Sequence, residues 1–203
     1  MSVSYEFDGQ VVLVTGGCGA LGSAIVEAFD AAGATACVTD VVEPGDEDAA
    51  IDADGIDFDY FPGDLTDEDD ARRVVEAVVA EHGRLDALCN IAGTWAGGSP
   101  LHETDVGTFE LLIAVNLKTM FLATKHALPH LQDAGGAVLS VSARSSLEGG
   151  TGDGPYRAAK AGVRLLTETV AEENLGTVRA NAIMPSVIDT PMNREMMPDA
   201  DHS

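Results

Sequence analysis

The chain has 203 residues, of which 34 are acidic and 11 basic, so its formal net charge is −23 at pH 7. Hydrophobic residues make up 45% of it, which excludes a disordered chain and suits one domain with a sizeable core. The negative charge disfavours binding to nucleic acid or to anionic membranes. No apolar run reaches the ~20 residues of a membrane span, and residues 1–6 lack the basic start of a signal peptide. We therefore expect a cytoplasmic protein.

The predicted elements alternate in type along the chain. A continuous β-branched run, as in residues 11–15, is typical of a strand buried on both faces. In chain order we predict strands at 11–15, 35–40, 57–61, 85–91, 137–142 and 178–184, and helices at 20–32, 66–82, 104–131 and 156–174. The alternation indicates one α/β domain over residues 1–203, with a doubly wound parallel sheet. Residues 143–155 are a Gly- and Ser-rich loop, and the chain after Pro185 shows no periodicity.

The densest acidic stretch lies between the second strand and the second helix. Residues 40–70 hold 14 Asp or Glu and no Lys or Arg. Aromatic residues and a helical pattern follow it, so we interpret it as acidic loops rather than an acidic tail. Because salt screens such repulsion, we hypothesise a halophilic protein from an acidic proteome. The three cysteines lack framework spacing, so we expect buried thiols, and we expect no metal site.

A Gly-rich turn joins the first strand to the first helix. Its glycines are Gly16, Gly19 and Gly22, in the pattern T-G-x-x-G-x-x-G. A pyrophosphate must approach backbone N–H groups at a helix start closely, and glycine leaves it room. Because this turn follows a strand and opens a helix, we predict a nucleotide-binding site there.

Asp40 ends the second predicted strand. A carboxylate there can accept hydrogen bonds from an adenosine ribose and would repel a 2′-phosphate. We see no Arg nearby in the sequence that would bind that phosphate. The sequence therefore favours NAD as cofactor, with NADP the less favoured alternative.

Tyr156 and Lys160 lie four residues apart on a predicted helix, which places them on one face. A phenol with a pKa near ~10 is a poor base at neutral pH, and a nearby ammonium would lower that pKa. With the nucleotide site, this pair suggests hydride transfer with a nicotinamide cofactor.

In their order and spacing, these motifs resemble those of the short-chain dehydrogenase/reductase family in its classical form. The resemblance rests on the Gly-rich turn, Asp64-Leu65, the Asn-Ile-Ala-Gly of 90–93, Asn116, Tyr156-x-x-x-Lys160 and the stretch 185–190. It implies a Rossmann fold of three αβα layers and an enzyme that interconverts an alcohol and a carbonyl with NAD(P).

The resemblance also implies roles for single residues. Tyr156 would be the acid/base, Lys160 would lower its pKa and hold the nicotinamide ribose, and Asn116 would hold a water of a proton relay. The residues expected to bind the cofactor, from the turn and the resemblance together, are Gly16, Gly19, Leu21, Gly22, Asp40, Asp64, Leu65, Asn90, Ala92, Gly93, Tyr156, Lys160, Pro185, Ile188 and Thr190.

The chain departs from the family pattern in three places. Where the family places a Ser that binds the substrate oxygen, this chain has Ala143; we expect Ser142 to fill the role, with Ser145 or a vacant role as alternatives. Ala20 stands where the family has glycine. The family also continues with a seventh strand and a substrate-covering segment. We therefore expect six strands, an exposed sheet edge and a reduced lid after about residue 190.

Three functions remain open on this evidence. The favoured one is an NAD(P)-dependent oxidoreductase; the others are a truncated, inactive NAD-binding remnant and, less favoured, an epimerase or dehydratase on the same scaffold. The expected partner is a small alcohol or carbonyl, whose pocket the loop 94–99 with Trp95 would shape. The resemblance further implies a homodimer or homotetramer of the full-length form, joined through the helices at 104–131 and 156–174.

Overall fold

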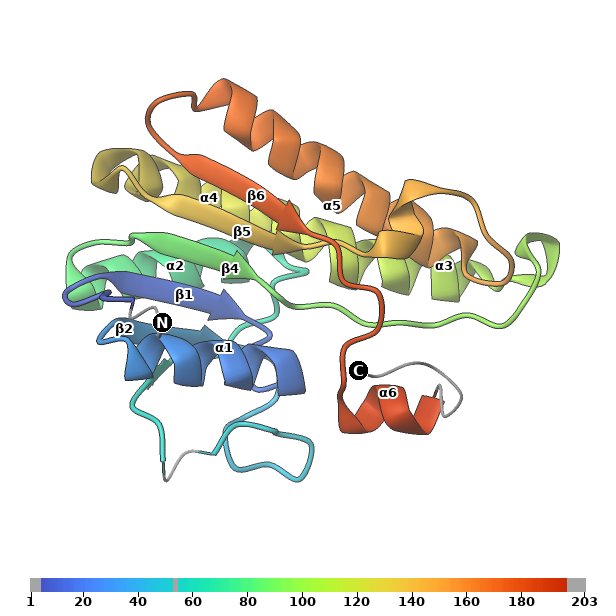
Figure 1. Ribbon diagram of the computed structural model, residues 1–203, viewed down its shortest axis with the longest axis horizontal. Helices are drawn as coiled ribbons and strands as arrows, with labels where there is room; N and C mark the ends of the chain where they lie inside the picture. The colour runs from blue at the N-terminus through green and yellow to red at the C-terminus, as the bar shows by residue number, and fades with distance from the viewer. Residues whose placement is uncertain (1–4, 53–54, 197–203) are drawn as a thin grey trace.

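The computed structural model describes residues 5–52 and 55–196. The predictions made for residues 1–4 and for residues 197–203 of the domain therefore lie outside the described residues. Figure 1 shows one twisted sheet with helices on both faces. All six strands are parallel, in the order β3-β2-β1-β4-β5-β6, as a doubly wound Rossmann sheet requires. They are β1 Val11–Thr15, β2 Thr35–Thr39, β3 Asp59–Tyr60, β4 Ala87–Asn90, β5 Ala137–Val141 and β6 Arg179–Ile183.

Two apolar clusters hold the layers together, because successive residues of β1 point to opposite faces of the sheet. Val11 and Leu13 pack with α2, α4 and α5, whereas Val12 and Val14 pack with α1 and the loop after β2. The predicted α/β sandwich is therefore confirmed. The helices are α1 Ala20–Ala31, α2 Glu68–His82, α3 Val106–Ile113, α4 Thr119–Ala134, α5 Gly154–Glu173 and α6 Pro191–Met196.

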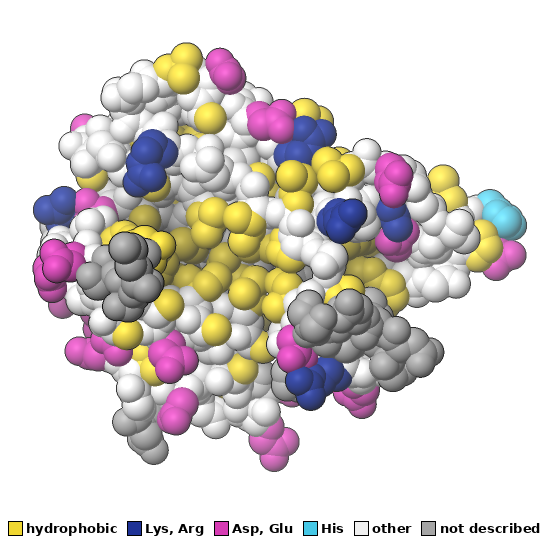
Figure 2. Space-filling model, viewed as in Figure 1, with side chains coloured by type: hydrophobic (Ala, Val, Ile, Leu, Met, Phe, Trp, Pro, Cys, Tyr) yellow, Lys and Arg dark blue, Asp and Glu magenta, His cyan; other side chains and the backbone are white. Residues whose placement is uncertain are grey.

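The α1 face of the sheet is only partly covered. In Figure 1, α1 lies over β1 and β2, while β4, β5 and β6 face the viewer. Figure 2 shows hydrophobic side chains gathered in a hollow across this face. Leu139 is half-buried, Ile183 is 41% exposed, and β6 forms the sheet edge among the described residues. The structure thus has the exposed edge expected of a six-stranded sheet.

Helix α2 begins at Glu68, two residues after the predicted start, and ends at the predicted His82. Asp67 caps it by accepting hydrogen bonds from the backbone N–H groups of Asp69 and Asp70, at 2.9 and 3.1 Å. The acidic first turn also suits the positive end of the helix dipole. The helix is capped at its end by Gly83, which adopts a left-handed conformation with φ of 76°.

The segment predicted as one helix over 104–131 is interrupted. A π-helical turn, Ala114–Lys118, separates α3 from α4, and the hydroxyl of Thr119 donates to the carbonyl of Val115 at 2.7 Å. Such turns rotate the side chains that follow them, and this one buries Asn116. Apolar periodicity does not distinguish a π-turn from a regular helix, so no sequence pattern predicts this interruption.

One helical segment among the described residues, Val106–Ala134, is long and apolar enough to cross a membrane by length and composition alone. The expectation that no stretch would qualify was therefore too strict. The inner face of the segment packs on the sheet through Leu122 and Leu131, as a core helix does, whereas Phe109 and Phe121 are about half exposed. By itself such a segment is weak evidence for a membrane protein.

Candidate active site

A cavity of about 710 Å³ opens at the carboxyl ends of β1, β2 and β4. It extends from the Gly-rich turn to Tyr156 and Lys160, so the fold brings together motifs that are widely spaced in the sequence. The predicted site residues that line it are Gly16, Gly19, Leu21, Gly22, Asp40, Asp64, Leu65, Ala92, Gly93, Asn116, Tyr156, Lys160, Ile188 and Thr190.

The three glycines of the turn are needed for different physical reasons. Gly16 has a φ of 67°, and a Cβ there would lie 2.7 Å from the Cα of Ala92. A Cβ on Gly22 would lie 2.1 Å from the carbonyl oxygen of Gly16, so both glycines are required by packing. A Cβ on Gly19 would meet only that same oxygen, at 3.4 Å. Gly19 is exposed at the start of α1, which leaves room for a phosphate beside the helix N-terminus.

Asp40 holds the turn from the side of β2. Its Oδ2 accepts the backbone N–H of Cys18 at 3.0 Å, and its Oδ1 accepts those of Val41 and Val42 at 2.8 and 3.2 Å. These bonds fix the carboxylate on the cavity wall. Burial and the neighbouring Asp40 raise the pKa of the Cys18 thiol to about 11, so this cysteine stays protonated at neutral pH.

The fold corrects one expectation at this end of the cavity. A second hollow of about 330 Å³ shares Asp40 with the cavity and is lined by Arg73, which the sequence reading had not associated with the adenosine end. The guanidinium donates to Asp70 Oδ1 from Nη2 at 2.8 Å and from Nε at 3.1 Å, and to the carbonyl of Pro62 at 2.9 Å. A cation is therefore close to Asp40, and its Nε and Nη2 groups are bound by Asp70 and Pro62.

Tyr156 and Lys160 meet at the other end of the cavity. The ammonium of Lys160 lies 5.9 Å from the centroid of the Tyr156 ring and donates to the carbonyl of Val141 at 2.9 Å. Lys160 is 5% exposed, and this burial lowers its pKa to about 8.

The pKa of Tyr156 is raised above its ordinary value, by burial first and then by Asp153. This direction is opposite to the lowering by Lys160 that the sequence suggested. The physical reason is that desolvation outweighs the ammonium in the protein alone, so the phenol is held in its neutral form.

Asn116 organises the floor between these groups. Its side-chain amide donates to the carbonyls of Thr94 and Leu112, at 2.9 and 3.0 Å, and its Oδ1 accepts the N–H of Thr94 at 3.2 Å. A Cβ on Gly93 would lie 2.8 Å from Asn116 Oδ1 and 3.1 Å from Lys160 Nζ. Gly93 thus allows the amide and the ammonium to approach the same backbone, and the Asn116 side chain fixes the loop after β4.

Ser142 does not line the cavity. Its hydroxyl is 2% exposed, donates to the carbonyl of Lys160 at 2.7 Å and lies 3.2 Å from the Ser146 hydroxyl. Neither Ala143 nor Ser145 is among the lining residues. Ser142 therefore supports the backbone of α5 from beneath.

Two further predicted residues lie behind the wall. Asn90 is buried and donates to the hydroxyls of Thr124 and Ser140, at 3.0 and 3.3 Å, which ties β4 to α4 and β5. Pro185 accepts the N–H of Arg144 at 2.9 Å and does not reach the cavity either.

Two loops are bonded to each other near the tyrosine end, and one of them lines the cavity through Thr94 and Trp95. Gly98 donates to the carbonyl of Gly152 at 2.8 Å, and both have a positive φ, of 106° and 88°. These contacts join the loop after β4 to the loop before α5. Arg157 holds the second loop by donating to Asp153 at 2.5 Å and to the carbonyl of Ser145 at 2.9 Å.

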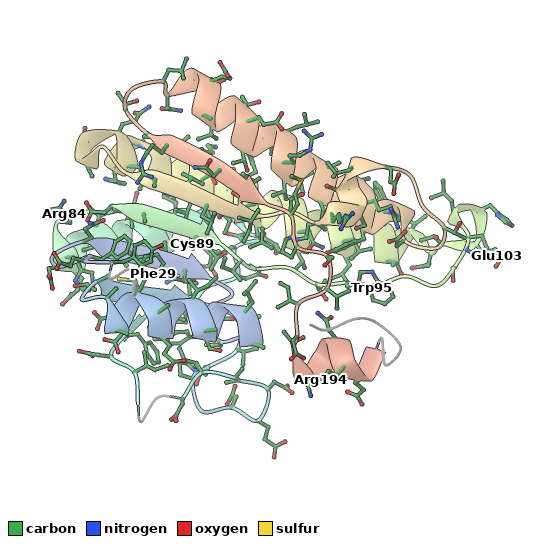
Figure 3. All side chains as sticks on the ribbon, viewed as in Figure 1. Phe29, Arg84, Cys89, Trp95, Glu103 and Arg194 are labelled. Carbon is green, nitrogen blue, oxygen red and sulfur yellow. The ribbon has the colours of Figure 1, made fainter. Side chains whose placement is uncertain are left out.

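A short helix, α6, covers part of the mouth where sequence patterns showed no element. Asn193 lines the cavity, and its side chain donates to the carbonyl of Ile188 at 2.8 Å. Figure 3 shows Trp95 on the loop after β4, above α6 with its Arg194. The expected loss of cover is therefore incomplete. The lining residues that sequence reasoning missed include Cys18, Val41, Asp48, Leu111, Val115 and Asn193; most lie on loops or helix faces, where no motif marks them.

Comparison with known proteins identifies the family of the chain. The short chain dehydrogenase family model matches residues 10–201. A cis-4-hydroxycyclohexanecarboxylate dehydrogenase of Sinomonas cyclohexanicum is 35% identical over 189 residues, which are 92% of this chain and 76% of that protein. A 3-oxoacyl-acyl-carrier-protein reductase of Thermotoga maritima is 33% identical over 94% of this chain and 79% of its own length.

The chain belongs to the short-chain dehydrogenase/reductase family. Solved structures agree with this assignment. The structure of levodione reductase superposes with a TM-score of 0.85 at 29% identity, and the match covers 96% of this chain and 79% of the levodione reductase chain. An NADH-dependent reductase responsible for alginate metabolism gives 0.81 at 27% identity, covering 95% and 82%. The protein is therefore an oxidoreductase enzyme that uses a nicotinamide cofactor. Within the described residues, no group of three or more His, Cys, Asp or Glu side chains could hold a metal ion.

Proposed function

We propose that this short-chain dehydrogenase/reductase interconverts a small alcohol and its carbonyl, with NAD(H) as the cofactor and Tyr156 as the acid/base. The observation that carries the proposal is a single cavity with the exposed Gly19 at one end and the Tyr156–Lys160 pair at the other. Bound nicotinamide would supply or accept the hydride at the substrate carbon.

In the reductive direction, Tyr156 would donate its phenolic proton to the substrate oxygen. Burial holds the phenol neutral at neutral pH, which suits it to act as an acid. Lys160, with a pKa near 8, would still carry charge at pH 7 and would stabilise the phenolate that the proton transfer leaves behind. In the oxidative direction the same proton would return to Tyr156.

Ser142 is proposed only as a support for Lys160, so the place of the family serine would be vacant in this chain. The residues proposed to hold the cofactor are the lining residues of the Gly-rich turn, Asp40, Asp64-Leu65 and the loop after β4, with Lys160, Ile188 and Thr190 at the nicotinamide end. Asn116 would keep the loop after β4 in place, and a water between it and Lys160 would complete the relay.

The test is a comparison of the whole chain with its Tyr156→Phe variant. We expect NADH to bind both equally by fluorescence titration, with NADPH binding weaker. Turnover on a panel of ketones and aldehydes should fall by about 10³-fold in the variant, as for the loss of an acid/base catalyst. Equal turnover in both would contradict the role of Tyr156. Binding of NADH without turnover on any member of an alcohol and carbonyl panel would instead support the inactive remnant.

We also propose that the protein forms homo-oligomers in the cytoplasm through the outer faces of α3, α4 and α5. Phe109, Phe121 and Leu165 are each about half exposed on these helices, and apolar exposure of this kind marks interaction surfaces. Light scattering after size exclusion tests the assembly. We expect Phe121→Gln to shift it toward monomer and Leu175→Gln, on the exposed turn after α5, to leave it unchanged.

A further inference from the structure

We propose that Asp48, in the loop after β2, acts together with Asp40 to reject a cofactor that carries a 2′-phosphate. The inference rests on the proposed function, because it requires the dinucleotide to bind in this cavity. It goes beyond that function by assigning the selectivity to two carboxylates from different segments rather than to the one at the end of β2.

The loop that carries Asp48 is anchored to the Gly-rich turn. Ala50 donates its backbone N–H to the carbonyl of Cys18 at 2.7 Å. The next residue, Ile51, is 5% exposed and packs in the same apolar cluster as Cys18. This anchor lies two residues after Asp48 and leaves Asp48 on the cavity wall.

Both carboxylates belong to segments that are bonded to one residue of the turn. The N–H of Cys18 is bound by Asp40 at 3.0 Å, and its carbonyl is bound by Ala50 of the Asp48 loop. Cys18 and Gly19 also line the cavity. The site therefore has one carboxylate on each of the two segments bonded to the turn that is proposed to hold the phosphates.

The balance of charge at this end is negative. Asp40, Asp48 and Asp64 line the cavity, and Lys160, at the opposite end, is the only Lys or Arg among its described lining residues. Arg73 lies in the adjoining hollow and is already bound by Asp70 and Pro62. A phosphate carries nearly two negative charges at neutral pH and would be repelled, whereas ribose hydroxyls can donate hydrogen bonds to carboxylates.

Removal of either carboxylate alone should leave a second barrier in place. We would measure the dissociation constants of NADH and NADPH for the whole chain and for Asp48→Asn, Asp40→Asn and the double variant, at one fixed KCl concentration. The matched control is Glu47→Gln, which removes the same charge from the adjacent, exposed residue that does not line the cavity.

We expect Asp48→Asn to tighten NADPH binding by about tenfold and to leave NADH binding within about twofold. The double variant should gain more for NADPH than either single variant, and Glu47→Gln should gain less than about twofold. Melting curves of all variants verify that the fold is retained.

Three results would overturn the inference. One is an unchanged NADPH affinity in Asp48→Asn, and another is an equal gain from Glu47→Gln, which would indicate net charge alone. The third is a change in preference caused by weaker NADH binding. Failure of the unaltered chain to bind either dinucleotide would overturn the proposed function itself, so the two failures are distinguishable.

Discussion

At the Gly-rich end of the cavity the groups that line it include the exposed carboxylate of Asp48 and the half-buried one of Asp40, whereas at the tyrosine end they include the buried side chains of Lys160 and Asn116. Asp40 and Asp48 act through a field that extends into solvent and that salt can screen. Lys160 and Asn116 are almost fully buried, so desolvation and fixed hydrogen bonds determine their properties. The difference predicts that salt, pH and substitutions will affect the two ends in different ways.

The largest effect should come from Lys160, because a buried ammonium costs stability. Its pKa falls from 10.5 in the unfolded chain to about 8 in the folded one, so between these values the unfolded state binds more protons. The destabilisation caused by this buried ammonium therefore shrinks, and the stability of the fold rises, as the pH rises from about 8 to 10.5. At pH 7 the cost is roughly 3 kcal/mol. Lys160→Met should be more stable by about that amount.

Denaturant unfolding of both proteins from pH 7 to 10.5 measures this difference. The stability advantage of Lys160→Met should shrink as the pH rises. Taking the difference removes the opposite trend of the cysteine thiols, whose raised pKa values are common to both proteins. A constant advantage across this range would contradict the assignment of a desolvated ammonium to the tyrosine end.

A second pair of variants, at Gly22 and Gly19, distinguishes a glycine needed for packing from a glycine that leaves space for the ligand. Gly22→Ala places a methyl group against the Gly16 carbonyl and should lower stability by about 2 kcal/mol. Gly19→Ala has room within the protein and should change stability by less than about 1 kcal/mol, while weakening NADH binding by at least about tenfold. Thermal melts and NADH titrations measure both. If Gly19→Ala binds NADH normally, the phosphates do not lie at Gly19.

Salt should raise the stability of the protein, because it screens the repulsion between the acidic side chains. The net charge is −23, and several of the few cations, such as Arg72, Arg84 and Arg164, are already in ion pairs, so the remaining carboxylates repel one another. We expect the melting temperature to rise by about 5 °C between low and molar KCl, roughly 2 kcal/mol for a domain of this size. Equal melting in both would refute the hypothesis of adaptation to salt.

The smallest effect concerns Ser142. Because its hydroxyl supports the Lys160 carbonyl rather than the cavity, Ser142→Ala should cost about 1 kcal/mol of stability and less than about tenfold in turnover. Ser145→Ala is the matched control and should affect neither quantity. Loss of turnover by several hundredfold in Ser142→Ala, with stability retained, would restore the serine to a role at the substrate oxygen.

The positions of the strands along the chain and the nucleotide-binding turn could be predicted from the sequence because they depend on regular patterns. Apolar runs such as residues 11–15 and the strand–turn–helix around Gly16 are local signals that the fold preserves. The same applies to Tyr156 and Lys160, since helical spacing places them on one face without any knowledge of distant contacts.

The rest depended on contacts between distant segments. Nothing local to Arg73 shows that α2 will bring it to the hollow beside Asp40. The direction of the Tyr156 pKa could not be read from its spacing to Lys160, because the burial of both groups is a property of the whole fold. The place of Asp48 on the cavity wall likewise could not be predicted, because it depends on the hydrogen bond between Ala50 and the distant Cys18.

The bond between Gly98 and Gly152 has a practical consequence for changing what this enzyme accepts. Each loop is held in its shape by the other, and both use a left-handed glycine at the contact. A loop grafted from a relative into one position alone would meet a partner of the wrong shape. Libraries aimed at new substrates should therefore exchange residues 94–99 and 144–153 together, as one transplanted unit.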